Sequence, residues 1–135
     1  MAEVVLTNAL LSVNGVDLSD HVRSITLNYL SEPQDITAMS DTTRQRIGGL
    51  LDWNVSVEFN QDFAAGEVDV SLFSLVGSTF TFIGRPDAGV VASTNPQYSG
   101  TALLTSYQPI NGAIGDVHTT SIQLEAAGAL TRATS

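Results

Sequence analysis

Alternating apolar and polar residues on both sides of a long unpatterned segment constrain the fold of this chain more than any other feature. From Trp53 to Phe59 every second residue is apolar, and Ser24–Tyr29 alternates in the same way. Successive side chains of a β-strand point to opposite faces, so this pattern predicts strands with one buried and one exposed face. Such half-buried strands are typical of antiparallel sheets.

The segment between these two strands, Ile36–Leu51, has no proline and no sustained helical periodicity, and it carries Arg44 and Arg46. Ordered loops of this length are uncommon and usually functional. Its apolar residues have no evident place in the core of their own domain, which predicts burial against a neighbouring molecule. These apolar residues are Ile36, Met39, Ile47, Leu50 and Leu51.

The rest of the chain contains further strand signals and one helix signal. Val4–Val13 reads as a strand or extended arm, and Asn14-Gly15 after it is a strong hairpin turn signal. Further strands are expected at Thr79–Ile83, Gly100–Tyr107 and Thr119–Ala126, and residues 127–135 read as a small-residue C-terminal arm.

One helix is expected over Ala64–Val76, with Asp62 as N-cap and Gly77 just beyond its end. Its core-facing stripe would consist of Val68, Leu72, Leu75 and Val76. The predicted fold is mainly β: an antiparallel β-sandwich or barrel with one flanking α-helix, in a single domain over residues 1–135.

The charge balance is strongly acidic. Fourteen acidic residues face five basic ones, all arginine, for a net charge of −9. This argues against a nucleic-acid-binding groove, which needs basic residues, but it suits a surface that nucleic acid must pass without sticking. The chain has no cysteine, its N-terminus does not read as a signal peptide, and no apolar run approaches the ~18 residues of a membrane span.

Signals for catalysis or metal binding are weak. His21 and His118 lack any metal-ligand spacing, and Asp17 and Asp20 lack the spacing of a calcium loop. Turn formation explains those aspartates better, and Trp53 reads as a core residue. We therefore expect no enzyme activity, no cofactor and no metal.

Three segments carry a resemblance to a known family. Asn14–Val22, Asp41–Arg46 and above all Asp52–Phe59 resemble the tail tube (major tail) proteins of long-tailed bacteriophages. The order of parts is also similar: N-terminal strand, long loop, alternating strand, single helix, further strands, C-terminal arm. The resemblance extends from about Val13 to the end of the chain.

The resemblance implies a structural virion protein that forms stacked, hexameric rings with an acidic lumen for DNA. Its implied partners are copies of itself and other tail proteins such as tape measure, terminator and distal tail proteins. Its implied location is the virion tail, after synthesis in the host cytoplasm. The long assembly loop 36–51 would then supply the subunit interface, through Ile36, Met39, Asp41, Arg44, Arg46, Ile47, Leu50 and Leu51.

Lumen-facing residues are expected on the polar faces of the alternating strands. The first choice is Asn54, Ser56 and Glu58 and the second is Thr26 and Asn28, with the outer surface as the alternative location. Whether the loop reaches sideways or along the tube axis stays open. Alternative functions are a tail terminator, a head–tail connector, a capsid decoration protein, or a tube subunit of a bacterial injection system.

Overall fold

Eight antiparallel strands form one sheet in the computed structural model, which describes residues 5, 7–65 and 67–135. The strand order is β2-β1-β5-β6-β7-β4-β3, and β8 pairs with β6 beside this path. The strands are β1 (Leu10–Val13), β2 (Val16–Asp17), β3 (Val22–Asp35), β4 (Arg46–Asn60), β5 (Thr79–Arg85), β6 (Gln97–Tyr107), β7 (Thr119–Ala126) and β8 (Thr131–Ala133).

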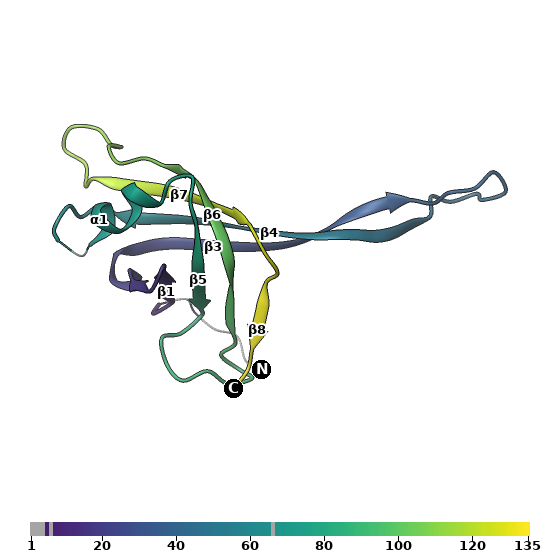
Figure 1. Ribbon diagram of the computed structural model, residues 1–135, viewed down its shortest axis with the longest axis horizontal. Helices are drawn as coiled ribbons and strands as arrows, with labels where there is room; N and C mark the ends of the chain where they lie inside the picture. The colour runs from purple at the N-terminus through teal and green to yellow at the C-terminus, as the bar shows by residue number, and fades with distance from the viewer. Residues whose placement is uncertain (1–4, 6, 66) are drawn as a thin grey trace.

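The most conspicuous element is the hairpin of β3 and β4, whose distal half projects far beyond the body of the molecule (Figure 1). The prediction of a loop over the whole of Ile36–Leu51 is wrong in its bounds. Residues 46–51 belong to β4, residues 29–35 continue β3, and the connecting loop covers 36–45. Neither face of the distal ribbon is buried by the chain, so no alternation marked these residues as strand.

A bulge interrupts the hairpin between the body and the tip. Ser31 pairs with Leu51, but the next aligned pair is Pro33 with Gly48, so β4 contains an extra residue. A Cβ on Gly49 would lie 2.6 Å from the carbonyl oxygen of Glu32. Glycine at this position therefore allows the two backbones to approach closely.

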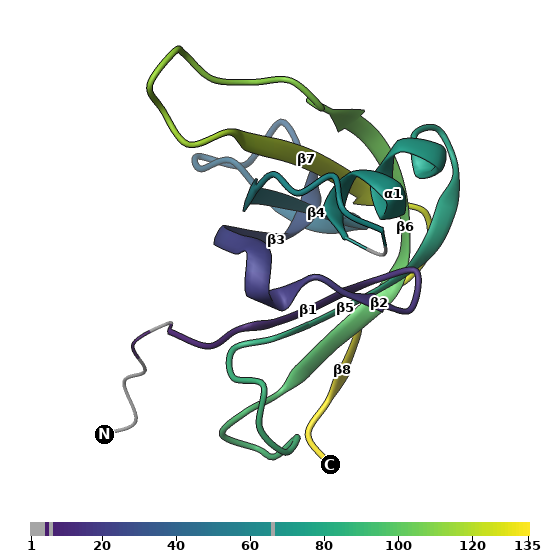
Figure 2. The same cartoon turned by 90° about the vertical axis from the view of Figure 1, so that its left-hand side faces the viewer.

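The core lies inside the curl of the sheet. Figure 2 shows β3, β4 and β7 passing over the layer formed by β1, β5, β6 and β8. The Trp53 ring on β4 stacks on Phe82 of β5, with centroids 6.0 Å apart. Fifteen buried apolar residues form this core: Leu11, Val13, Leu18, Trp53, Val55, Val57, Phe59, Val68, Leu72, Phe80, Phe82, Ala102, Leu104, Ile122 and Leu124.

The C-terminal arm is closed onto the body by Trp53. The indole Nε1 donates a hydrogen bond to the carbonyl of Gly128 at 2.9 Å. Beyond this contact β8 pairs with β6, so the segment 127–135 is partly strand and not a free tail. Of the strand expected over Val4–Val13, only the last part, from Leu10, is strand β1. Residues 1–4 and 6 lie outside the described part.

Asn14 and Gly15 form the predicted turn. Both have positive φ values, 52° and 81°, and they connect the paired residues Val13 and Val16. Two positive φ values are the signature of the type I′ hairpin turn, which explains the Asn-Gly pair.

The helix is shorter than expected. It consists of α1 (Val68–Leu72) followed by the 3₁₀ turn η2 (Phe73–Leu75), and Gly66 of the expected range lies outside the described residues. Val68 and Leu72 are fully buried as predicted, whereas Val76 is 47% exposed because the chain has left the helix by then. The N-cap residue is Glu67 rather than Asp62. Among the described residues, no helix has the length and apolarity to cross a membrane.

Candidate assembly surfaces

The hairpin gathers all eight predicted interface residues. Ile36, Met39, Asp41 and Arg44 lie in the connecting loop, whereas Arg46, Ile47, Leu50 and Leu51 lie on β4. Their apolar members are strongly exposed, from 57% for Ile47 to 105% for Met39. An isolated two-stranded ribbon is marginally stable in water. The distal hairpin is therefore an unpartnered apolar surface on a long arm.

Hydrogen bonds within residues 35–45 hold the tip in a defined shape. The amide of Ile36 donates to the carbonyl of Gln45, and the amide of Gln45 donates to the Thr37 hydroxyl, at 2.9 and 2.8 Å. The Asp41 carboxylate accepts from the amide of Ala38 at 2.8 Å. Asp41 thus shapes the turn of the tip.

The two tip arginines differ in their surroundings. Arg44 Nη1 lies 2.7 Å from Asp35 Oδ2 within the same hairpin. Hydrogen bonds from Thr37, and then the Arg44 pair, hold the pKa of Asp35 below its ordinary value of 3.8. Both partners are exposed, so the pair itself contributes little to stability. Arg46 makes no ion pair with any carboxylate in the part of the chain that the structure describes.

A second surface is the polar face of the sheet, on the side away from the core. The five predicted lumen residues share it, since the strand register pairs Thr26 with Ser56 and Asn28 with Asn54. The Asn28 amide donates to Asn54 Oδ1 at 3.0 Å, and Glu58 lies 3.3 Å from Arg23. Hydrogen bonds between neighbouring strands therefore order this face.

The polar face extends onto β7, which was not among the predicted site residues. Gln123 pairs with Ser56 and accepts a hydrogen bond from its hydroxyl at 2.6 Å. Glu125 lies opposite Asn54, and Ser121 lies opposite Glu58. The alternation of Thr119–Ala126 already separated these residues from Ile122 and Leu124. It could not show that β7 lies beside β4.

Three acidic side chains surround the imidazole of His21. His21 Nε2 lies 2.5 Å from Glu67 Oε2, 3.6 Å from Asp20 Oδ1 and 3.9 Å from Asp62 Oδ2. Ligand atoms of Asp20, His21 and Glu67 lie within 4.8 Å of one another. The hydrogen bond between imidazole and carboxylate accounts for this proximity. Asp17 accepts from the amide of Ser19, the turn role that the sequence indicated.

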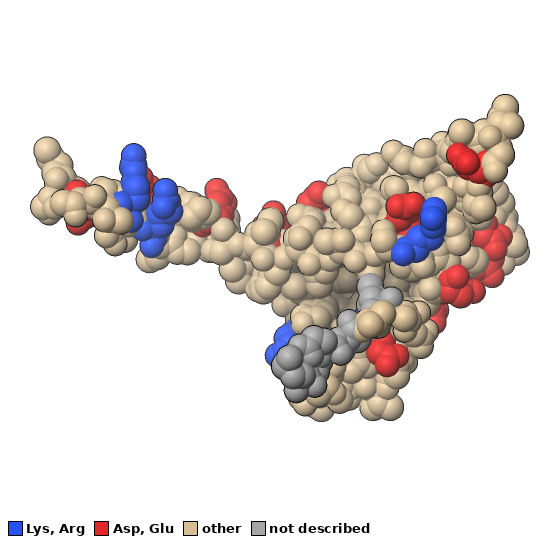
Figure 3. All heavy atoms as spheres, turned by 180° about the vertical axis from the view of Figure 1, so that it is seen from behind, with Lys and Arg blue, Asp and Glu red and all other residues tan. Residues whose placement is uncertain are grey.

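Charge is distributed unevenly over the molecule. In Figure 3 acidic groups are spread over the body, and basic groups stand out on the projecting hairpin, where the sequence places Arg44 and Arg46. The hairpin also carries Glu32, Asp35 and Asp41. It is therefore a mixed-charge arm on an acidic body.

Comparison with known proteins identifies the fold. No family model matches the chain, and no curated protein matches its sequence. Solved structures do match. Two structures of a gene transfer agent, the virion of the native particle and the tail of the empty particle with C6 symmetry, share 18% identity with this chain at TM-scores of 0.71 and 0.70. These alignments cover 93% and 92% of this chain and 95% and 92% of the others.

The tail tube of SPP1 aligns with a TM-score of 0.70 and 11% identity over 95% of this chain and 76% of its own. Hcp1 from Flavobacterium johnsoniae aligns with a TM-score of 0.52 and 13% identity over 93% of this chain and 98% of its own. The mainly antiparallel fold with a single short helix is therefore that of tail tube structures, as the sequence resemblance predicted.

Proposed function

We propose that this chain is a structural subunit that assembles with copies of itself into the tube of a virion tail. The observation that carries the proposal is the distal β3–β4 hairpin, which projects from the body (Figure 1) and whose apolar residues are left exposed by the described part of the chain. The shared fold with two tail assemblies supports it. In this role the protein acts by assembling and has no catalytic function.

The proposed assembly consists of stacked rings. Sixfold rings are supported by the C6 symmetry stated for the gene transfer agent tail with the same fold. Subunits would join through the eight interface residues of the hairpin, and further partners would be other tail proteins such as tape measure, terminator and distal tail proteins. The acidic body and the net charge of −9 suit a conduit that DNA passes without binding.

The polar face of β3, β4 and β7 is the proposed lumen wall. Its side chains are hydrophilic and ordered by mutual hydrogen bonds, with Glu58 and Glu125 as its acidic members. Such a face needs no apolar partner and can stay wet. The opposite face of β4 and β7 contributes to the core, whereas that of β3 stays partly exposed.

A tube subunit of a bacterial injection system is the second candidate. The fold likeness to a bacterial Hcp1 favours it, at a lower TM-score than the tail structures. Identification of the tube's contents distinguishes the two: DNA supports the tail tube, and protein supports the injection tube.

Truncation of the hairpin tests the proposal. Because Ser31 and Leu51 are paired, residues 32–50 can be replaced by an Asn-Gly turn without changing the register of the remaining strands. We expect the wild-type protein to form rings or tubes in negative-stain micrographs at high concentration. The truncated protein should stay monomeric in light scattering with an unchanged β-type circular dichroism spectrum.

The matched control is Ile114→Ser, since Ile114 is 106% exposed on a different loop and should not affect assembly. Normal tubes from the truncated protein would contradict the role of the hairpin. Failure of the wild-type protein to assemble under any solution condition would contradict the tube function.

A further inference from the structure

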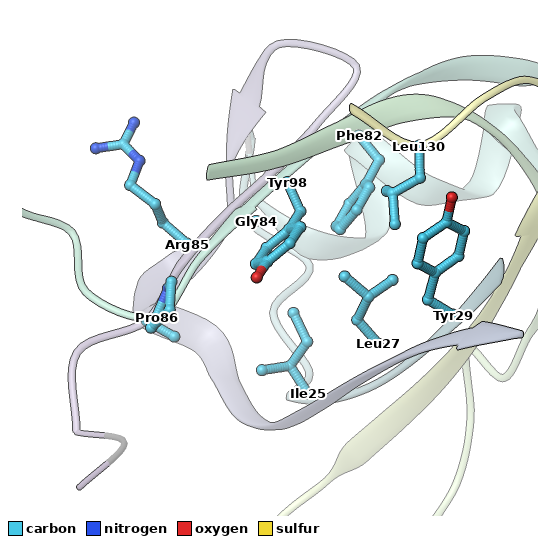
Figure 4. Close-up of a pocket in the computed structure, with 10 residues that line it drawn as sticks. Ile25, Leu27, Tyr29, Phe82, Gly84, Arg85, Pro86, Tyr98 and Leu130 are labelled. Carbon is cyan, nitrogen blue, oxygen red and sulfur yellow. The ribbon is translucent and has the colours of Figure 1, made fainter. Parts of the chain in front are cut away.

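A second unpartnered apolar surface lies on the body, in an open groove of about 420 Å³ between β3 and the strands β5 and β6. Figure 4 shows Ile25, Leu27 and Tyr29 pointing from β3 toward Tyr98 and Leu130 on the other side. β3 is the last strand of the sheet, so no further strand among the described residues covers this side. The groove therefore offers apolar and aromatic side chains to a partner.

The hairpin tip cannot fill the groove of its own chain. Tyr29 lines the groove at the base of the hairpin, and β3 runs on from there to Asp35. At about 3.3 Å per residue, Ile36 at the tip lies ~23 Å beyond Tyr29. The hairpin also projects away from the body (Figure 1). A tip that enters a groove must therefore enter that of another copy.

Charge at the rim of the groove complements charge on the hairpin. Arg85 lies at one end of the groove, but its side chain points away from the apolar residues (Figure 4), and its Nη1 donates to the carbonyl of Gly89 at 2.6 Å. Arg132 on β8 lies opposite Tyr98 in the strand register. Neither arginine forms an ion pair with a described carboxylate. The hairpin offers the exposed carboxylates of Glu32 and Asp41, whereas Asp35 is already paired with Arg44.

We propose that the groove between β3 and β5–β6 receives the distal hairpin of a second copy of this chain. The apolar side chains of Ile36, Met39 and Ile47 enter it, and hairpin carboxylates face Arg132 at the rim. Tip and groove are different surfaces of one chain, so the contact is heterologous and repeats from copy to copy into a ring or an open filament. The inference rests on the proposed self-assembly and names the surface that accepts the hairpin.

Cysteine crosslinking tests the contact directly, because the native chain contains no cysteine. One protein carries Met39→Cys at the tip, and a second carries Leu27→Cys in the groove. The two are mixed, assembled, oxidised and run on a non-reducing gel. A disulfide requires Cα atoms within about 7 Å, so a product of one tip and one groove chain reports that contact. Ile47→Cys with Tyr98→Cys forms a second pair in case the first misfolds.

The matched control mixes Met39→Cys with Ile114→Cys, which lies on the exposed loop between β6 and β7. We expect several-fold more crosslinked dimer from a tip–groove pair than from the control. If assemblies form but both tip–groove pairs yield no more crosslinked dimer than the control, the docking site is wrong. The proposed tube function is not contradicted by that result. A wild-type protein that forms no assembly overturns both proposals.

Discussion

At the scale of single residues, Tyr107 shows how one polar side chain secures the helix to the sheet. Its hydroxyl donates to Asp69 Oδ1 at 2.7 Å and accepts from Gln61 Nε2 at 3.0 Å. Partial burial, followed by the hydrogen bond to Asp69, raises the pKa of Tyr107 to about 12. Since α1 is short and has no side-chain cap, this tertiary contact contributes to holding it in place.

We predict that Tyr107→Phe lowers the free energy of unfolding by ~0.5–1.5 kcal/mol at neutral pH, because it removes one hydrogen bond and leaves Asp69 without this donor. A pKa raised from 10.0 to about 12 stabilises the fold fully below pH 10, and this contribution is lost as the pH rises toward 12. Urea unfolding across that range should show a steeper loss for the wild type than for the variant. Tyr29→Phe serves as the control, and equal slopes would contradict the role of Tyr107.

At the scale of elements, the β3–β4 hairpin combines a packed base with an unpacked distal half. At the base, Val55 and Val57 are buried in the core, whereas the residues beyond Leu51 toward the tip are mostly exposed. The bulge at Gly49 separates the two parts. Bulges bend a strand and increase its twist, so this position helps to set the direction of the arm.

Gly49→Ala tests the bulge. A Cβ at 2.6 Å from the Glu32 carbonyl forces the two strands apart, at a local cost of ~1–3 kcal/mol. We expect faster amide hydrogen exchange in residues 31–35 and weaker assembly, with little change in the exchange of core strands. At Gly89 the nearest atom to an added Cβ is 3.9 Å away, so Gly89→Ala should leave both measurements unchanged. Unaltered exchange in Gly49→Ala would show that the bulge tolerates a side chain.

At the scale of the whole molecule, the fold separates three surfaces. The core lies within the curl of the sheet, the polar face of β3, β4 and β7 lies on its other side, and the hairpin extends beyond both. The distal hairpin and the groove beside β3 are exposed apolar surfaces. Such a chain is suited to an assembly that buries these two surfaces and leaves the polar face in contact with water.

Charge reversal on the polar face tests its proposed place in the lumen. We predict that Glu58→Lys assembles normally but slows DNA passage several-fold, because the new cation, next to Arg23, attracts phosphates. Assembly is measured by negative-stain microscopy, and passage by the rate of DNA release from particles that contain the variant. Glu58→Gln, which removes charge without adding a cation, should have a weaker effect. Normal release from Glu58→Lys particles would place this face outside the lumen.

The strands that alternation marked were predictable, but the buried face expected for Ser24–Tyr29 was wrong, because its apolar side chains line the open groove and Tyr29 is 56% exposed. Trp53 to Phe59 and Thr119–Ala126 are strands with the expected buried faces, and Asn14-Gly15 forms the expected turn. The distal hairpin was mistaken for a loop because neither of its faces is buried within a single chain. Its sequence therefore lacks the alternation of apolar and polar residues that marks a half-buried strand. The helix was predicted too long at both ends: it begins at Val68 rather than Ala64, and Phe73–Leu75 tighten into a 3₁₀ turn.

The amino-acid sequence by itself determined which residues favour strands, which faces of those strands avoid water, and that no known catalytic motif is present. These properties depend on neighbours along the chain. Tertiary structure alone decided that Ser56 meets Gln123, that Trp53 reaches Gly128, and that no other described segment covers the distal hairpin or the groove. Strand register and the curl of the sheet join residues far apart in the chain, and no local pattern records that pairing.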